Sequence, residues 1–176
     1  MNPLEKLDKK EVRDLLCKCW MTHDAMWFFH CLQDFGIEKT NKINKAAVRT
    51  MAAVEARRLL KSLGYSEDDL HSFVGFQNVF NDMFGVIRAD FMKGETEFLK
   101  DGTLRVTWHQ CFAYDGVKKL GVIDGYRCGI FDRLEGWFEE FGLKFTVEPK
   151  VEGCMMRTDG HCYRDYKFGM PVEDSV

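Results

Sequence analysis

The chain has 176 residues, of which 45% are hydrophobic and 30% charged, and its net charge is −3. This composition excludes a disordered or fibrous chain, and the lack of a basic excess argues against nucleic acid as a partner. No stretch reaches the roughly 18 apolar residues of a membrane span, and residues 1–10 lack the apolar core of a signal peptide. We therefore expect one soluble, cytoplasmic domain that spans residues 1–176.

The first part of the chain, residues 1–84, has helical periodicity. Apolar side chains recur at helical spacing over residues 7–35 up to Gly36, which predicts one long and deeply buried helix. A second helix is predicted over residues 39–63, with Gly64 as its C-terminal stop. A third helix is expected to begin at Ser66 and to extend to about residue 84.

The second part, residues 85–176, mixes alternating and helical patterns. Residues 96–109 predict a hairpin around Asp101-Gly102, and Asp124 is expected to cap a long helix that ends at Gly142. A strand over 143–147 and a second hairpin over 151–168 follow. The order of elements predicts an α+β fold in which N-terminal helices pack on one face of a small antiparallel sheet.

Four of the seven cysteines lie in the sheet half, and they suggest a metal site. A cysteine-rich chain without an export signal belongs to a reducing compartment, where thiols act as metal ligands before they act as disulfides. Zinc is the first candidate because it takes four thiolate or imidazole ligands, with iron or no metal as the alternatives. The candidate ligands are Cys111, Cys128, Cys154, Cys162, His109 and His161.

Local spacing suggests that some of these candidate ligands lie together, but it leaves open which side chain lies beside Cys154. If the strand continues past Trp108, His109 and Cys111 point to the same face. The length of the last hairpin loop decides whether Cys154 faces Cys162 or His161. None of these cysteines forms a C-x-x-C pair, and each could instead pack as a small hydrophobic side chain.

A second candidate site lies in the N-terminal helix, in the run W-M-T-H-D-A-M-W. Cys19 and His23 are four residues apart and share a helix face, which is the minimum arrangement for an activated cysteine nucleophile. Around them, the residues that could bind a ligand are Trp20, Asp24, Trp27 and His30. The alternative is a core histidine that packs among tryptophans.

The run from Trp20 to Phe28 and the F-G-I-E-K-T-N-K-I-N-K-A-A that follows resemble an uncharacterised family of anaerobic bacteria and archaea. The later cysteines, with Tyr126, Gly153, Gly160 and Tyr163, resemble the L-2-amino-thiazoline-4-carboxylic acid hydrolase family and, more weakly, 4-vinyl reductase domains. The latter resemblance implies the ligand-binding fold that those domains share with haem nitric-oxide sensors and transport-particle subunits. It also implies that Cys154 and Cys162 bind metal.

Three hypotheses for function follow. The leading one is a small-molecule or metal-binding domain organised around the cysteine and histidine cluster. The alternatives are a cysteine- or metal-dependent hydrolase of a small cyclic amide or thiazoline-type substrate, and a structural or partner-binding subunit. The sequence leaves open whether the protein is an enzyme, which ligand or metal it takes, and whether it forms a homodimer.

Overall fold

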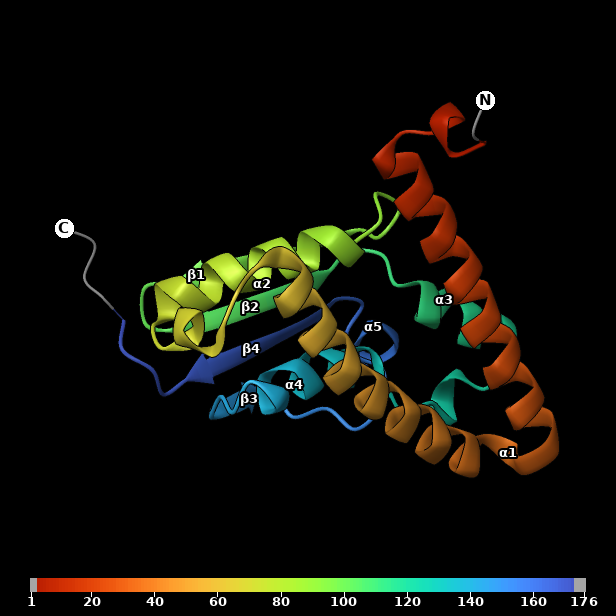
Figure 1. The fold of residues 1–176 in the computed structure, drawn as a ribbon. Coiled ribbons are helices and arrows are strands. Elements are labelled where there is room, and N and C mark those ends of the chain that lie inside the picture. The colour runs from red at the N-terminus through yellow and green to blue at the C-terminus, as the bar shows by residue number, and fades with distance from the viewer. Residues whose placement is uncertain (1–2, 173–176) are drawn as a thin grey trace.

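The first and longest element is helix α1 (Lys9–Leu63), which bends sharply at Gly36. The computed structural model describes residues 3–172. Gly36 has φ 71° and ψ 173°, a conformation that side chains with a Cβ rarely adopt, so the helix changes direction there. We call residues 9–35 the first arm and residues 37–63 the second arm; the two arms open away from each other in Figure 1.

The ends of α1 are set by local signals in the sequence. The side chain of Asp8 accepts a hydrogen bond from the Glu11 backbone N–H at 2.8 Å, and the Glu11 side chain returns one to the Asp8 N–H at 2.9 Å. At the other end, Gly64 takes a left-handed conformation with φ 79° and closes the helix. The two helices predicted over residues 7–63 are therefore the two arms of α1.

The remaining helices alternate with a small antiparallel sheet. Its strand order is β1-β2-β4-β3, and all three pairs are antiparallel. Within residues 3–172 no helix is both long and apolar enough to cross a membrane. The remaining elements in chain order are η1 (Pro3–Lys6), η2 (Glu67–Leu70), α2 (Phe73–Ile87), β1 (Gly94–Leu99), β2 (Thr103–Trp108), α3 (Phe112–Lys119), η3 (Ile123–Gly125), α4 (Ile130–Glu140), β3 (Phe145–Glu148), α5 (Met155–Thr158) and β4 (Cys162–Phe168).

The core lies on one face of this sheet, beneath α2, α4 and the second arm of α1 (Figure 1). Aromatic rings fill it; Phe76 and Phe138 are fully buried and meet edge to face with centroids 5.7 Å apart. The opposite face of the sheet is polar, where Arg105 forms two 2.7 Å hydrogen bonds with Asp165. The predicted α+β class is therefore confirmed.

Three details of the prediction are wrong. Residues 151–168 do not form a hairpin, because α5 occupies the first half and β4 pairs with β2 and β3. The strand predicted to reach His109 ends at Trp108 and does not continue to Cys111, which instead directly precedes α3. Asp124 lies in η3 and does not cap the long helix, which begins at Ile130.

Candidate functional site

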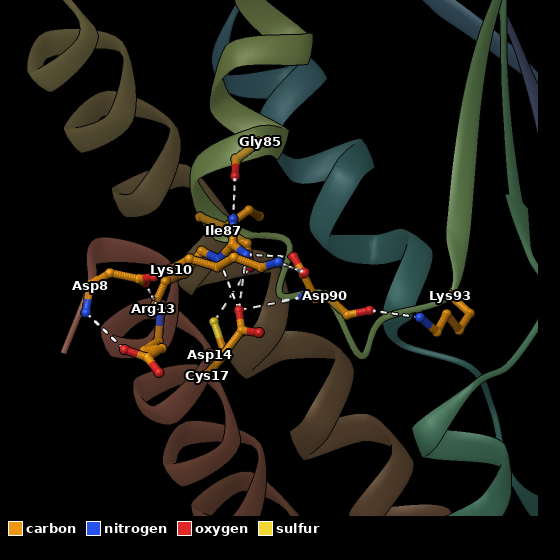
Figure 2. A network of polar contacts seen from close by, with 10 residues as sticks. Asp8, Lys10, Arg13, Asp14, Cys17, Gly85, Ile87, Asp90 and Lys93 are labelled. Atoms are coloured by element: carbon orange, nitrogen blue, oxygen red, sulfur yellow. Dashed lines mark hydrogen bonds and ion pairs between the residues drawn. The ribbon is translucent and has the colours of Figure 1, made fainter.

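The N-terminal end of the first arm is fixed to the segment that follows α2. Arg13 donates hydrogen bonds to Asp90 at 2.8 Å and to Asp14 at 3.0 Å, and both contacts can be followed in Figure 2. Lys10 also pairs with Asp90, and these two cations hold the pKa of the Asp90 carboxyl below its usual range. The Cys17 thiol lies 3.5 Å from the backbone oxygen of Ile87. This network holds the beginning of the arm against the body of the protein.

A second attachment lies on either side of the bend. The ring of Phe28 meets the buried ring of Tyr126 edge to face, with centroids 5.9 Å apart. Beyond Gly36, the buried side chain of Asn41 donates to the backbone oxygen of Gly125 at 2.8 Å. It also accepts from the backbone N–H of Arg127 at 3.0 Å. The segment 125–127 is thereby fixed to α1.

Between these attachments α1 exposes a large apolar surface, which corrects the expectation of a deeply buried helix. Leu16 and Trp27 are each 63% exposed, and with Trp20 they follow one another at helical spacing along one stripe of the arm. Within residues 3–172 Arg133 lies over the ring of Trp20, but Leu16 and Trp27 remain mostly exposed, so the apolar pattern of this arm did not become core. Further exposed apolar side chains of α1 are Leu15, Met26, Phe35 and Ile43.

The stripe borders a groove between the two arms, which we call the inter-arm groove. It consists of two hollows of about 890 Å³ and about 300 Å³ that share Trp20, Ala47 and Met51. On the second arm the larger hollow is lined by small side chains, Ala46, Ala47 and Thr50, and the smaller one reaches Trp27. The ring of Trp20 on the first arm therefore faces a wall of the second arm in which these small side chains lie beside larger ones such as Met51 and Leu59.

Charged groups are fixed along this groove. Glu55 lines the larger hollow and accepts from Arg133 at 2.8 Å and from the indole N–H of Trp137 at 3.0 Å. The Arg133 guanidinium lies 4.8 Å from the ring centroid of Trp20. In the smaller hollow, partial burial raises the pKa of Asp24, and the neighbouring His23 opposes the rise.

The predicted nucleophile pair does not form a contact in this structure. Cys19 and His23 are exposed, and no hydrogen bond joins them within the described residues. The indole N–H of Trp27 donates instead to Nε2 of His23 at 3.1 Å. Of the predicted ligand-binding residues, Trp20, Asp24 and Trp27 line the groove, whereas His30 is exposed beside Phe29.

The four later cysteines come together from four elements. Cys111 precedes α3, Cys128 precedes α4, Cys154 precedes α5, and Cys162 begins β4. Burial raises the pKa of the Cys128 thiol to about 12, and the other three thiols add to the rise. Burial likewise raises the pKa of Cys162 to about 12. It also raises the pKa of Cys111, and the backbone N–H groups of Tyr114 and Ala113 oppose this rise. Burial thus favours the neutral thiol at Cys111, Cys128 and Cys162, and we call these three with Cys154 the cysteine cluster.

The two histidines of the predicted metal set lie outside this cluster. His109 is exposed, with its Nε2 3.1 Å from Glu95. His161 is also exposed and stacks on Tyr163, with its Nδ1 3.0 Å from the backbone oxygen of Asp159. Across residues 3–172, no three histidine, cysteine or acidic side chains stand close enough to hold one metal ion.

Two polar side chains beside the cysteine cluster were missed by the sequence reasoning. The first is Arg164, which is buried and has its guanidinium over the ring of Phe131. Its Nη1 donates to the backbone oxygen of Tyr163 at 2.8 Å and lies 3.6 Å from the Met155 sulfur. The indole N–H of Trp108 is buried and has no hydrogen-bond partner among the described residues. The alternation of side chains in β4 could have indicated that Arg164 is buried, because residues two apart share a face and Tyr166 lies on the core face.

Comparisons with known proteins agree with this architecture. A structure of subunit 3 of a trafficking protein particle complex from Naegleria fowleri, covalently bound to palmitic acid, matches 92% of this chain and 98% of its own length, with a TM-score of 0.57. Its sequence identity is 12%, so the likeness establishes the fold alone. A family model matches residues 5–97, just over half of the chain, and the chain belongs to this family of unknown function, DUF6125. No functionally curated protein matches the sequence.

Proposed function

We propose that this protein is a partner-binding subunit that assembles with a second copy of itself through α1. The observation that carries the proposal is the stripe of large apolar side chains along the first arm, in which Leu16 and Trp27 are each 63% exposed. Exposed apolar surface of this kind, bordered by charged groups such as Asp24 and Glu55, marks interaction sites in soluble domains. The similar fold in the trafficking complex belongs to a protein that is itself a subunit of an assembly.

The shape of the surface favours a second copy as the partner. The same surface carries the exposed ring of Trp27, the partly exposed ring of Trp20 and a groove lined in part by the small side chains of Ala46, Ala47 and Thr50. A two-fold symmetric pairing uses the same patch on both subunits, so each copy supplies rings for the groove of the other. Large side chains that enter pockets at the centre of an interface contribute most of its binding energy.

The test is the mass of the protein in solution, measured by light scattering across a range of concentrations. We expect a dimer for the wild type and a monomer for the Trp27→Glu/Leu16→Glu variant, because a charge in an apolar interface costs several kcal/mol. Val74→Glu is the matched control, since Val74 is 45% exposed on α2 and lies outside the groove. A wild-type protein that stays monomeric at every concentration would overturn the proposal.

A second candidate function, small-molecule binding, is favoured by the smaller hollow. Its volume of about 300 Å³ lies at the lower limit for small-molecule pockets, and Trp20, Trp27 and Phe28 line it with Asp24. Palmitic acid is the probe, because the similar fold was found with that molecule bound. Saturable quenching of tryptophan fluorescence by a brominated palmitic acid, lost in Trp27→Ala, would support this function. Linear quenching unchanged in the variant would reject it.

A further inference from the structure

The first arm of α1 is attached to the body of the protein less firmly than the second arm. On the first arm, which the structure describes throughout, Cys17 is the only buried side chain, whereas Ala52 and Ala56 of the second arm lie in the main core. The ion pair of Arg13 with Asp90 lies at the surface, and pairs of this kind add little stability (Figure 2). Detaching the first arm therefore uncovers little buried surface and leaves the core intact.

The bend between the arms depends on one residue. Gly36 has φ 71° and ψ 173°, and the residues on both sides of it are helical. A Cβ at Gly36 would meet no side chain or neighbouring segment within 4 Å, so a change of its backbone angles meets no obstacle there. Helical angles at this one residue would make α1 a single straight helix of 55 residues, about 80 Å long. Gly36 is therefore placed as a hinge.

A straight α1 takes the first arm away from its own body, and the body of a second copy offers the same contacts. Near the start of the arm, Arg13 donates to Asp90 at 2.8 Å. Further along, the ring of Phe28 meets the ring of Tyr126. Both contacts join the first arm to the body, so they can form unchanged between two copies that exchange their arms. Asn41 lies beyond the hinge and keeps the second arm on its own body.

Exposed apolar side chains flank the hinge. Phe35 is 51% exposed on one side of Gly36, and Ile43 is 46% exposed on the other. In a straight α1 these two side chains lie about two helical turns apart. Two straight helices that cross at a two-fold axis near the hinge would cover them, and in a single copy they stay exposed. The exchanged form thus gains an interface that the bent single chain lacks.

We propose that the first arm is exchanged between two copies of this chain about the Gly36 hinge, so that each first arm lies on the body of the other copy. The exchange uses the contacts of the arm with the body and not the apolar stripe, so it goes beyond the pairing proposed above. Glycine at this position permits the bent single chain. A residue with a Cβ disfavours the bend, because φ 71° lies in the left-handed region, and thereby favours the straight helix.

The first experiment compares Gly36→Ala with the matched control Gly64→Ala by light scattering over a range of concentrations. Both glycines have a positive φ and open space for a Cβ, but Gly64 ends α1 and is not a hinge. We expect the dimer dissociation constant to fall by at least about tenfold in Gly36→Ala and to change by less than about twofold in Gly64→Ala. Unchanged dimerisation of folded Gly36→Ala would overturn the proposal.

An added pair of changes separates the exchange from pairing through the apolar stripe. Leu16→Glu/Trp27→Glu removes that pairing, because it places charges in the apolar surface. In the Gly36→Ala background the exchanged dimer should remain, since neither side chain joins the arm to the body through a buried contact. A dimer that disappears in this background would assign the assembly to the stripe and reject the exchange.

The second experiment tests the connectivity with Gly36 in place. Arg13→Asp and Asp90→Arg each put like charges at the contact of the arm with its own body. In an exchanged dimer of the two variants, each arm instead meets an opposite charge on the body of the other chain. Native mass spectrometry of an equimolar mixture should therefore show more mixed dimer than the statistical share. Mixed dimer at or below that share would overturn the exchange, whatever the folding of Gly36→Ala.

Discussion

The ring of Phe28 lies edge-on against the ring of Tyr126, with centroids 5.9 Å apart and planes at 74°. This contact joins the first arm of α1 to the buried cluster that contains Cys154. Phe28 lines the inter-arm groove, and Tyr126 packs against Cys154 in the buried cluster at the base of α3. A partner that moves the first arm would therefore act on the surroundings of the thiols through these two rings.

We expect Phe28→Ala to loosen the first arm more than it destabilises the domain. The variant loses one aromatic pair and part of the buried area of one ring, about 1–3 kcal/mol in total. Hydrogen exchange should therefore speed up over residues 20–35 and change little in β2 and β4. Phe35→Ala is the control, because Phe35 is 51% exposed on the same arm. Equal exchange in the two variants would show that the contact with Tyr126 does not hold the arm.

Asn41 should be among the most sensitive polar positions of α1. Its amide joins the Gly125 oxygen and the Arg127 N–H, and Asn41→Ala leaves both backbone groups without these partners. We expect a loss of about 2–4 kcal/mol in the free energy of unfolding, measured with urea. Asn78→Ala on α2 is the matched change at an exposed position and should cost less than about 1 kcal/mol. A similar loss in both variants would contradict the importance assigned to the two hydrogen bonds.

Elements with strong local signals could be predicted from the sequence. Features that depend on packing between distant parts of the chain, such as the burial of the first arm, could not. The bend at Gly36 and the hairpin at Gly102 both require a residue that tolerates positive φ, so they could be found locally. The apolar stripe of the first arm has the same periodicity as a core helix, and no local rule shows that the rest of the chain leaves it uncovered. The cysteine set was found by counting thiols, whereas the exclusion of His109 and His161 depends on where β2 ends and α5 begins.

The stability of the α1–α4 contact should depend on pH through Glu135. Burial raises the pKa of this carboxyl, Asp132 adds to the rise, and Arg49 opposes it. The native state therefore holds more protons than the unfolded state above the usual pKa of about 4.5, and stability falls as pH rises through the native pKa. Glutamine does not titrate, so Glu135→Gln removes this pH dependence. As the pH rises from the usual pKa to the raised native pKa of Glu135, the wild type should therefore lose stability relative to the variant. Parallel curves of unfolding free energy against pH would contradict the prediction.

The thiols should divide into two classes by their rate of alkylation. At pH 8 a thiol with a pKa of about 12 is only about 10⁻⁴ ionised, and the thiolate is the reactive form. Cys128 and Cys162 should therefore react with iodoacetamide far more slowly than the exposed Cys19, by at least about 100-fold. Mass spectrometry after timed labelling checks this, and labelling in urea, where all seven cysteines should react, is the control. If Cys162 reacted as fast as Cys19 in the native protein, the buried thiols would be accessible and ionised, and the prediction would be wrong.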